Sequence, residues 1–135
     1  MRFFDTNILV YTQSDEDPHK RKIACDLVAQ ALESGGDGYI STQVIQEFCN
    51  TMRRKTRRST AEINALIDYF LDLWRCDVTP ELVRRALAVQ DKYGISFYDA
   101  LIVSTAESLG CREILTEDLN DGQEYCGMVA VNPFK

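Results

Sequence analysis

Four acidic residues that are far apart in the sequence each stand near the end of a predicted strand or the start of a predicted helix. They are Asp5, Glu47, Asp99 and Asp118. Asp5 and Asp99 lie in strongly apolar stretches, where an unpaired carboxylate is energetically costly. If the four converge, each pair repels by about 3 kcal/mol at a separation of ~5 Å and an effective dielectric constant of ~20. Such acids need a shared partner.

A hard divalent cation would remove this repulsion. A set of oxygen ligands without histidine or thiolate favours Mg²⁺ or Mn²⁺. An ion in an open pocket suits phosphate chemistry, because it can activate a water molecule and a second ion can stabilise the leaving oxygen. The only histidine, His19, lies in the polar stretch 19–22 and is expected on a solvated helix face. Chemistry that depends on an imidazole base is therefore not expected.

Strands and helices are predicted to alternate along the chain. The strands are expected at residues 2–5, 39–41, 76–78, 113–115 and 128–131. Helices are expected from about residue 8, or after the polar stretch 14–17, to residue 33, and then at about 42–52, 59–73, 80–93 and 96–110, capped by Thr42, Ser59, Thr79 and Ser96. This alternation predicts one α/β domain over residues 1–135, with a mostly parallel sheet covered on both faces.

The predicted elements bring the four acids to one edge of this sheet. Asp5 ends the first strand and Asp118 follows the strand 113–115, so both emerge at the carboxyl edge if the two strands are parallel. Asp99 is in the first turn of one helix, and Glu47 is one turn into another. Helices that follow parallel strands begin at the same edge, where sites of such sheets form. The four carboxylates can therefore share a pocket.

Each acid also has a purely structural interpretation. Asp5 can cap the helix that follows it, and Asp99 can complete a capping box with Ser96, which stabilises a helix by about 1 kcal/mol. Asp118 can open a turn with the polar residues after it. Glu47 can lie on the exposed border of an amphipathic helix. The sequence leaves these alternatives open.

The composition limits the class of protein. The chain has 135 residues, of which 45% are hydrophobic and 27% are charged, as in an ordinary folded domain. Its five cysteines are widely spaced and form no CxxC pair, so neither a disulfide scaffold nor a cysteine zinc site is expected, and most are expected to be buried. No apolar run approaches the ~20 residues of a membrane-spanning helix, and no signal peptide is evident. We expect a cytoplasmic protein without membrane contact.

The charge distribution has two opposed features. The net charge is −6, which by itself argues against a nucleic-acid partner, since the phosphate backbone attracts cations. A basic strip nevertheless places five cations in six positions: Arg53, Arg54, Lys55, Arg57 and Arg58. The strip is either a solvated helix end or a surface that follows an RNA backbone near Glu47. An acidic pocket beside a basic strip would account for both features.

Four sequence blocks resemble the PIN-domain ribonucleases, and specifically the VapC-type toxins of type II toxin–antitoxin pairs. The blocks are FDTNILVY at 4–11, QEF at 46–48, SFYDALI at 96–102 and LTEDL at 115–119. The ending VNPF at 131–134 is similar to one VapC subgroup. A single DTN would be weak evidence. Four blocks in the right order, each with its acid, are strong evidence. The match extends over nearly the whole chain.

The resemblance implies a three-layer α/β/α fold and Mg²⁺- or Mn²⁺-dependent endonuclease activity on RNA that leaves a 5′-phosphate and a 3′-hydroxyl. It also implies a homodimer and a small VapB-type antitoxin protein that blocks the pocket. By this resemblance the acidic pocket consists of Asp5, Glu47, Asp99 and Asp118, with Thr6 and Asn7 close to the metal, Thr116 orienting water or a carboxylate, and Asp121 able to share the role of Asp118.

Two other functions stay open. Aspartate-nucleophile phosphatases also place an aspartate at the end of the first strand, but they need a second one two residues later, where this chain has Asn7. A non-catalytic PIN domain that binds RNA or protein is the other alternative. No member of the acidic quartet is missing, so no residue of this chain favours the second alternative.

Overall fold

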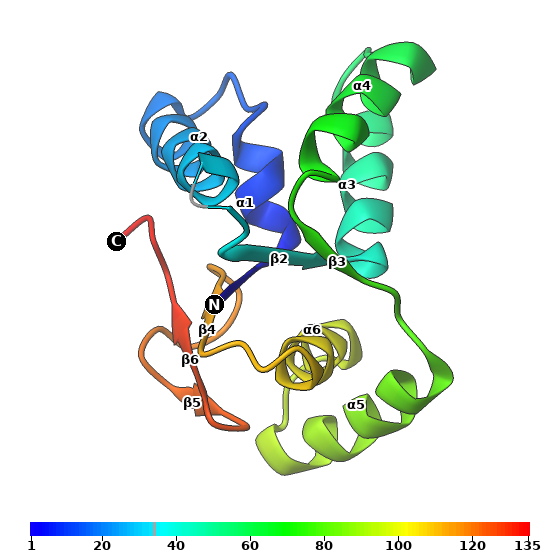
Figure 1. The fold of residues 1–135 in the computed structure, drawn as a ribbon, viewed down its shortest axis with the longest axis vertical. Coiled ribbons are helices and arrows are strands. Elements are labelled where there is room, and N and C mark those ends of the chain that lie inside the picture. Colours follow the sequence, from blue (N-terminus) through cyan, green and yellow to red (C-terminus); the bar gives the residue numbers. More distant parts are fainter. Residues whose placement is uncertain (34) are drawn as a thin grey trace.

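The computed structural model describes residues 1–33 and 35–135 (Figure 1). In these residues six strands form one sheet with the order β3-β2-β1-β4-β6-β5, in which only the β5–β6 pair is antiparallel. The strands are β1 (Arg2–Phe4), β2 (Gly38–Ser41), β3 (Trp74–Cys76), β4 (Glu113–Leu115), β5 (Glu124–Tyr125) and β6 (Met128–Val131). The mostly parallel sheet is as predicted.

Helices cover both faces of the sheet, which confirms the α/β/α prediction. They are α1 (Thr6–Tyr11), α2 (Pro18–Glu33), α3 (Thr42–Lys55), α4 (Thr60–Phe70), α5 (Pro80–Tyr93) and α6 (Phe97–Ser108). Figure 1 shows α1 to α4 on one side of the sheet and α5 and α6 on the other. No helix in the described part of the chain combines the length and the apolar character needed to span a membrane.

Local capping signals account for most of the helix boundaries. Ser59 forms the predicted capping box with Glu62, and Thr79 and Ser96 cap α5 and α6 as expected. The cap of α3 is Ser41 and not Thr42, because the Ser41 hydroxyl accepts from the Val44 N–H at 3.3 Å. The Thr42 hydroxyl instead accepts from the N–H of Val78.

Three element predictions were incomplete. The strand predicted at 76–78 lies at Trp74–Cys76, since β2 pairs with those residues. The first helical region is two helices, separated by the polar stretch, and not one. The short strand β5 was missed; it pairs with β6 through a turn whose central residues, Cys126 and Gly127, have φ values of 51° and 85°. A two-residue strand has too little pattern to be read from sequence.

The two central strands are buried on both faces. Phe3 and Phe4 of β1 are both fully buried, as is Ile114 of β4. Helices on both sides of the sheet cause this burial. β1 and β4 run side by side with Phe4 opposite Leu115, so the residues after them are delivered together at the centre of the carboxyl edge.

The cysteines lie differently from expectation. All five are free thiols, but only Cys111 is buried and the other four are half-buried. Cys25 and Cys49 lie on α2 and α3, Cys76 ends β3, and Cys126 is in the turn between β5 and β6. Cys25 on α2, for example, directs its Sγ to the carbonyl of Thr12, 3.6 Å away. The exclusion of a disulfide scaffold therefore stands, whereas the expected burial of most thiols was wrong.

Candidate active site

Asp5 connects β1 to α1 and is both a helix cap and a member of the acidic pocket. Its backbone N–H donates to the carbonyl of Leu115 at 3.0 Å, which ties it to the end of β4. Its Oδ1 accepts from the N–H of Thr6 at 2.7 Å, and its Oδ2 accepts from the hydroxyl of Thr116 at 2.8 Å. The residue is only 5% exposed. Asp5 therefore caps α1, as its structural interpretation predicts, whereas its role in metal binding stays a prediction.

The surroundings of Asp5 favour its protonated form when no metal is bound. The pKa of Asp5 is raised to about 7, chiefly by burial and to a smaller extent by the charges of Asp118 and Glu47. The hydrogen bonds from Thr116 and Thr6 act in the opposite direction. A buried carboxylate whose neighbours are other carboxylates is a group that a cation would stabilise in its charged form.

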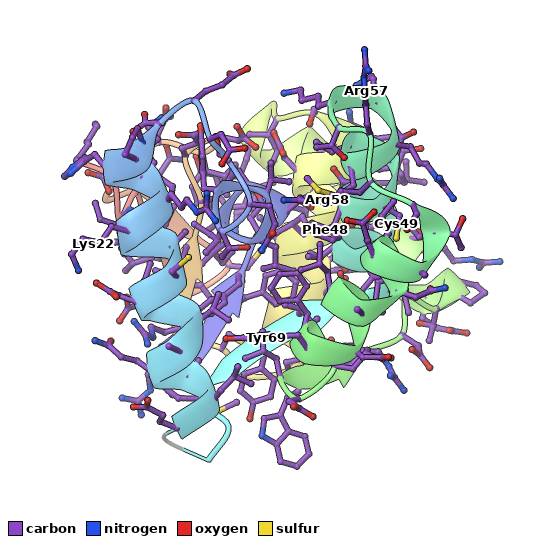
Figure 2. All side chains as sticks on the ribbon, turned by 90° about the horizontal axis from the view of Figure 1, so that it is seen from above. Lys22, Phe48, Cys49, Arg57, Arg58 and Tyr69 are labelled. Carbon is purple, nitrogen blue, oxygen red and sulfur yellow. The ribbon has the colours of Figure 1, made fainter. Side chains whose placement is uncertain are left out.

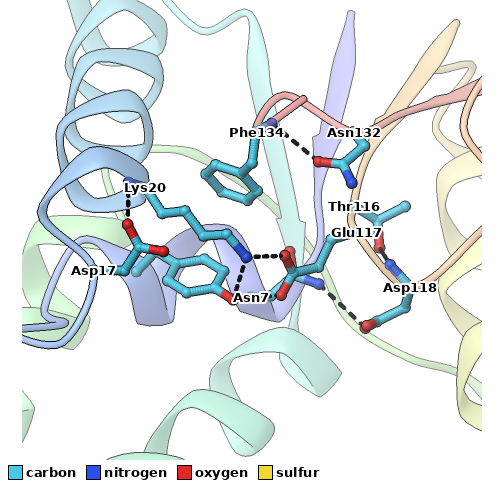
Figure 3. A network of polar contacts seen from close by, with 9 residues as sticks. Asn7, Asp17, Lys20, Thr116, Glu117, Asp118, Asn132 and Phe134 are labelled. Carbon is cyan, nitrogen blue, oxygen red and sulfur yellow. Dashed lines mark hydrogen bonds and ion pairs between the residues drawn. The ribbon is translucent and has the colours of Figure 1, made fainter.

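Asp118 follows β4 and is held from two sides. Its backbone N–H donates to the Thr116 hydroxyl at 3.0 Å, and its Oδ2 accepts from Asn7 Nδ2 at 3.1 Å (Figure 3). The same Thr116 hydroxyl donates to Asp5, so one side chain orients two of the predicted acids. Thr116 and Asn7 thus contact two of the predicted acids, and their supporting role in a metal site stays a prediction.

Asp99 approaches from the other side of the sheet, in the first turn of α6. Its N–H donates to the Ser96 hydroxyl at 3.2 Å, which completes the cap of the helix. Its carboxyl group is half-buried, and this burial raises its pKa, with a further contribution from the charge of Asp118. Carboxylate oxygens of Asp5, Asp99 and Asp118 all lie within 4.8 Å of one another.

Glu47 lies beside this group of three carboxylates without being part of it. Burial raises the pKa of Glu47, and the charges of Asp99 and Asp118 add to the shift, so the four acids interact electrostatically. Gln43 holds Glu47 in place: its Nε2 donates to Glu47 Oε1 at 2.7 Å and to the carbonyl of Tyr98 at 3.1 Å. Sequence reasoning missed Gln43, although its spacing of four residues from Glu47 was a usable signal.

The donor set fits a hard divalent cation. Among the described residues, no ion pair links a lysine, arginine or histidine to any of the four acids. The buried Oγ1 of Thr6 and Oδ1 of Asn7 have no hydrogen-bond partner. Three clustered carboxylates and two free neutral oxygens are the ligand chemistry of Mg²⁺ or Mn²⁺.

A cleft with a volume of about 460 Å³ opens beside the acids. It is lined by Asn7, Glu47 and Asp118 together with Arg54 and Lys55 of the basic strip. A cleft with acidic residues and cations on its walls can hold a polyanion next to a metal site.

The other three cations of the strip have different surroundings. Arg53 donates to the hydroxyl of Thr60, and Arg58 Nη1 lies 3.2 Å from the sulfur of Met52. Arg57 is exposed and points away from the body of the protein (Figure 2). The strip is thus divided between the cleft and the outer end of α3.

Asp121 lies against the C-terminal segment. Its Oδ1 accepts from the N–H of Asn132 at 2.8 Å, and its Oδ2 is 3.9 Å from the ammonium of Lys135. These contacts occupy both of its carboxylate oxygens. The group of three carboxylates contains Asp118 and not Asp121.

A second polar network adjoins the site and was not anticipated. Glu117 Oε1 accepts from the hydroxyl of Tyr11 at 2.5 Å, and its Oε2 accepts from Lys20 Nζ at 2.9 Å (Figure 3). Tyr11 also packs edge-on against Phe134, with ring centroids 4.9 Å apart. Tyr11 and Glu117 line the cleft. Asn7 and Tyr11 are four residues apart and so lie on the same face of α1, and this spacing was the sequence signal that Tyr11 adjoins the site.

Comparison with known families and curated sequences gives one match. The family model described as PIN domain matches residues 2–120. Among curated proteins, none matches this chain.

Several solved structures share the fold. A toxin–antitoxin complex from Klebsiella pneumoniae has 20% identity and a TM-score of 0.69, with 98% of each chain covered. VapC20 of Mycobacterium tuberculosis, a toxin that cleaves the sarcin–ricin loop, has 19% identity and a TM-score of 0.62, with 84% of this chain and 87% of that chain covered. VapBC2 from Rickettsia felis, bound to a DNA fragment from its promoter, has 16% identity and a TM-score of 0.66, with 96% of each chain covered.

Proposed function

This chain belongs to the PIN domain family, and on that basis we propose that it is a Mg²⁺- or Mn²⁺-dependent endoribonuclease. The observation that carries the proposal is the group formed by Asp5, Asp99 and Asp118, whose carboxylate oxygens lie within 4.8 Å of one another. Arg54 and Lys55 line the adjoining cleft and supply the positive charge that an RNA backbone needs.

The side chains of the site have separate tasks in this proposal. Asp5, Asp99 and Asp118 hold the ion, and Glu47 adds negative charge beside them. When bound, a divalent ion activates a water molecule for attack on phosphorus and neutralises the charge that develops. Thr116 keeps the Asp5 carboxylate oriented through a 2.8 Å hydrogen bond. Attack by water with departure of the 3′-oxygen leaves a 5′-phosphate and a 3′-hydroxyl.

We further propose that the chain is the toxin of a toxin–antitoxin pair and acts as a homodimer. One of the structural neighbours is described as a toxin–antitoxin complex, another as VapBC2 bound to DNA from its promoter, and a third as a toxin that cleaves the sarcin–ricin loop. A small antitoxin protein is therefore the expected partner. Capture of a co-encoded small protein by this chain, with loss of nuclease activity in the complex, tests this part.

The central test compares wild type with Asp5→Asn on total RNA. Wild type with Mg²⁺ or Mn²⁺ should cut RNA and leave 5′-phosphate ends, and both EDTA and Asp5→Asn should abolish cleavage. Asp26→Asn is the matched control, because Asp26 is an exposed aspartate that pairs with Lys22 on α2. Full activity of Asp5→Asn, or unchanged cleavage in EDTA, would contradict the proposal. Sequencing the RNA ends after brief expression identifies the RNA that is cut.

The two alternative functions give different results in the same assays. A non-catalytic domain would bind RNA tightly and cleave none of it. An aspartate-based phosphatase would hydrolyse a small phosphate ester. At the position where that chemistry needs a second acid, Asn7 instead donates its amide to Asp118 at 3.1 Å, so we do not favour this alternative.

A further inference from the structure

Two consecutive carboxylates follow β4, and their side chains have entirely different partners. Asp118 accepts from Asn7 and belongs to the group of three acids with Asp5. Glu117 instead accepts from Tyr11 and Lys20, on α1 and α2 (Figure 3). Either of two adjacent acids in a loop could present its carboxylate to the metal site. Here Glu117 is bound by Tyr11 and Lys20 instead.

Lys20 is the cation that holds Glu117. Its Nζ lies 2.9 Å from Glu117 Oε2 and 3.2 Å from the hydroxyl oxygen of Tyr11. The ammonium also lies 4.8 Å from the ring centroid of Tyr11 and 5.5 Å from that of Phe134. Side-chain exposure is only 30% for Lys20 and 24% for Glu117, so the pair is more sheltered than the other ion pairs of α2.

The position of Lys20 is itself set by the start of α2. Its backbone N–H donates to Oδ1 of Asp17 at 3.0 Å, which anchors the first turn of the helix. From there the side chain reaches across α1 to the loop after β4. One lysine thus connects α2, α1, that loop and the C-terminal segment.

A free Glu117 would act against the metal site in two ways. Its charge would add to the repulsion among the acids, because like charges at close range in a sheltered cleft repel strongly. Its carboxylate would also compete with Asp118, its sequence neighbour, for a place beside Asp5. Neutralising and anchoring Glu117 removes both effects.

We propose that Lys20 is a positioning residue of the metal site. By holding Glu117 against Tyr11, it orients the loop after β4 so that Asp118 alone presents its carboxylate to the ion. This inference rests on the proposed metal dependence. Partners of this kind, which orient ligands without touching the metal, typically change metal affinity by about 10- to 100-fold when they are removed.

Direct Mn²⁺ binding to Lys20→Met tests the proposal, measured by the electron paramagnetic resonance signal of free Mn²⁺. Methionine keeps the apolar stem and removes only the cation. We expect binding to weaken by about tenfold. The sign is informative, since the loss of a positive charge without any change in geometry would strengthen the binding of a cation.

Lys22→Met is the matched control. Lys22 lies on the same helix, pairs with Asp26 at 2.8 Å and points into solvent (Figure 2). This substitution removes the same charge without touching the loop after β4, so Mn²⁺ binding should be unchanged or slightly tighter. Lys20→Arg, which keeps a cation for Glu117, should restore most of the affinity that Lys20→Met lacks.

Tyr11→Phe gives an independent measurement and applies even if Lys20→Met does not fold. Phenylalanine keeps the ring and removes only the hydroxyl that donates to Glu117 Oε1, without any change in charge, so Mn²⁺ binding should weaken. Adding Glu117→Gln to Lys20→Met should restore Mn²⁺ affinity, because no free carboxylate is then left to compete with Asp118.

Three results separate the possible failures. Unchanged or tighter Mn²⁺ binding in Lys20→Met, or in Tyr11→Phe if the first does not fold, would overturn the positioning role. Weaker RNA binding with unchanged Mn²⁺ affinity would also overturn it and assign Lys20 to the substrate. Wild-type protein that binds Mn²⁺ but leaves RNA intact would overturn the ribonuclease proposal alone.

Discussion

The hydroxyl of Thr116 donates a 2.8 Å hydrogen bond to Oδ2 of Asp5 across 111 residues of sequence. The same hydroxyl accepts from the N–H of Asp118 at 3.0 Å. One small side chain at the end of β4 therefore sets the relative orientation of two of the clustered acids. Thr116 lies at the carboxyl edge of the sheet and is buried there, with only 1% of its surface exposed.

Replacing Thr116 with valine should weaken metal binding. Valine has the same shape but cannot donate to Asp5, so the Asp5 carboxylate loses a partner that lowers its pKa. We expect Mn²⁺ affinity to fall by about tenfold, as for other residues that orient metal ligands. Thr105→Val is the control, since its buried hydroxyl donates only to a carbonyl within α6. Equal Mn²⁺ affinities of the two variants would argue against the role of Thr116.

The stability of the metal-free protein should depend on the protonation of Asp5. Burial raises its pKa from 3.8 to about 7, so between these values the folded state keeps a proton that the unfolded state has released. The free energy of unfolding should therefore fall as the pH rises from about 4 to about 7. Burial also raises the pKa values of Glu47 and Asp99, with the same sign.

Asp5→Asn isolates the contribution of that residue, because asparagine does not titrate. Urea unfolding in the presence of a chelator, measured across this pH range, should show a flatter profile for Asp5→Asn than for wild type. Each unit of pKa shift corresponds to about 1.4 kcal/mol, so the difference is measurable. Superimposable profiles would mean that Asp5 is not protonated in the folded protein.

Gln43→Met should destabilise the protein and impair the site. It removes the hydrogen bonds from Gln43 to Glu47 and to the Tyr98 carbonyl, which join α3 to the start of α6. Loss of a buried hydrogen bond to a charged group costs about 1 to 3 kcal/mol, which urea unfolding can detect. Gln46→Met on the exposed face of α3 is the control and should leave stability unchanged. The prediction fails if both variants unfold at the same urea concentration.

The two cleft-lining cations should contribute more to RNA binding than Arg57 does. Arg54 and Lys55 line the cleft, whereas Arg57 points outward. Arg54→Ala with Lys55→Ala should weaken RNA binding and reduce its salt dependence, by about 0.7 in slope for each phosphate of a single strand that the variant no longer neutralises. Arg57→Ala should have a smaller effect on both. Binding isotherms at several salt concentrations check this. If both variants show the same salt slope as wild type, the whole strip is a solvated helix end.

Local patterns in the sequence determined the order of strands and helices, most of the caps and the edge at which the acids emerge. These features depend on short-range rules: alternation of elements, hydroxyl side chains at helix starts and the geometry of parallel strands. For the same reason Asp5, Asp99 and Asp118 could be expected together from their places at the ends of β1 and β4 and the start of α6.

The choice between neighbouring side chains depended on contacts that no local pattern describes. Glu117 pairs with Lys20 and Asp118 contacts Asn7, in each case across about a hundred residues of sequence. Asp121 contacts the C-terminal segment, which the fold brings beside it. These pairings follow from packing between separate elements. Side-chain direction in a loop is set by the partners that the fold brings within reach. The sequence therefore determined which acids gather at this edge, and the tertiary structure alone set which oxygen of each one faces the site.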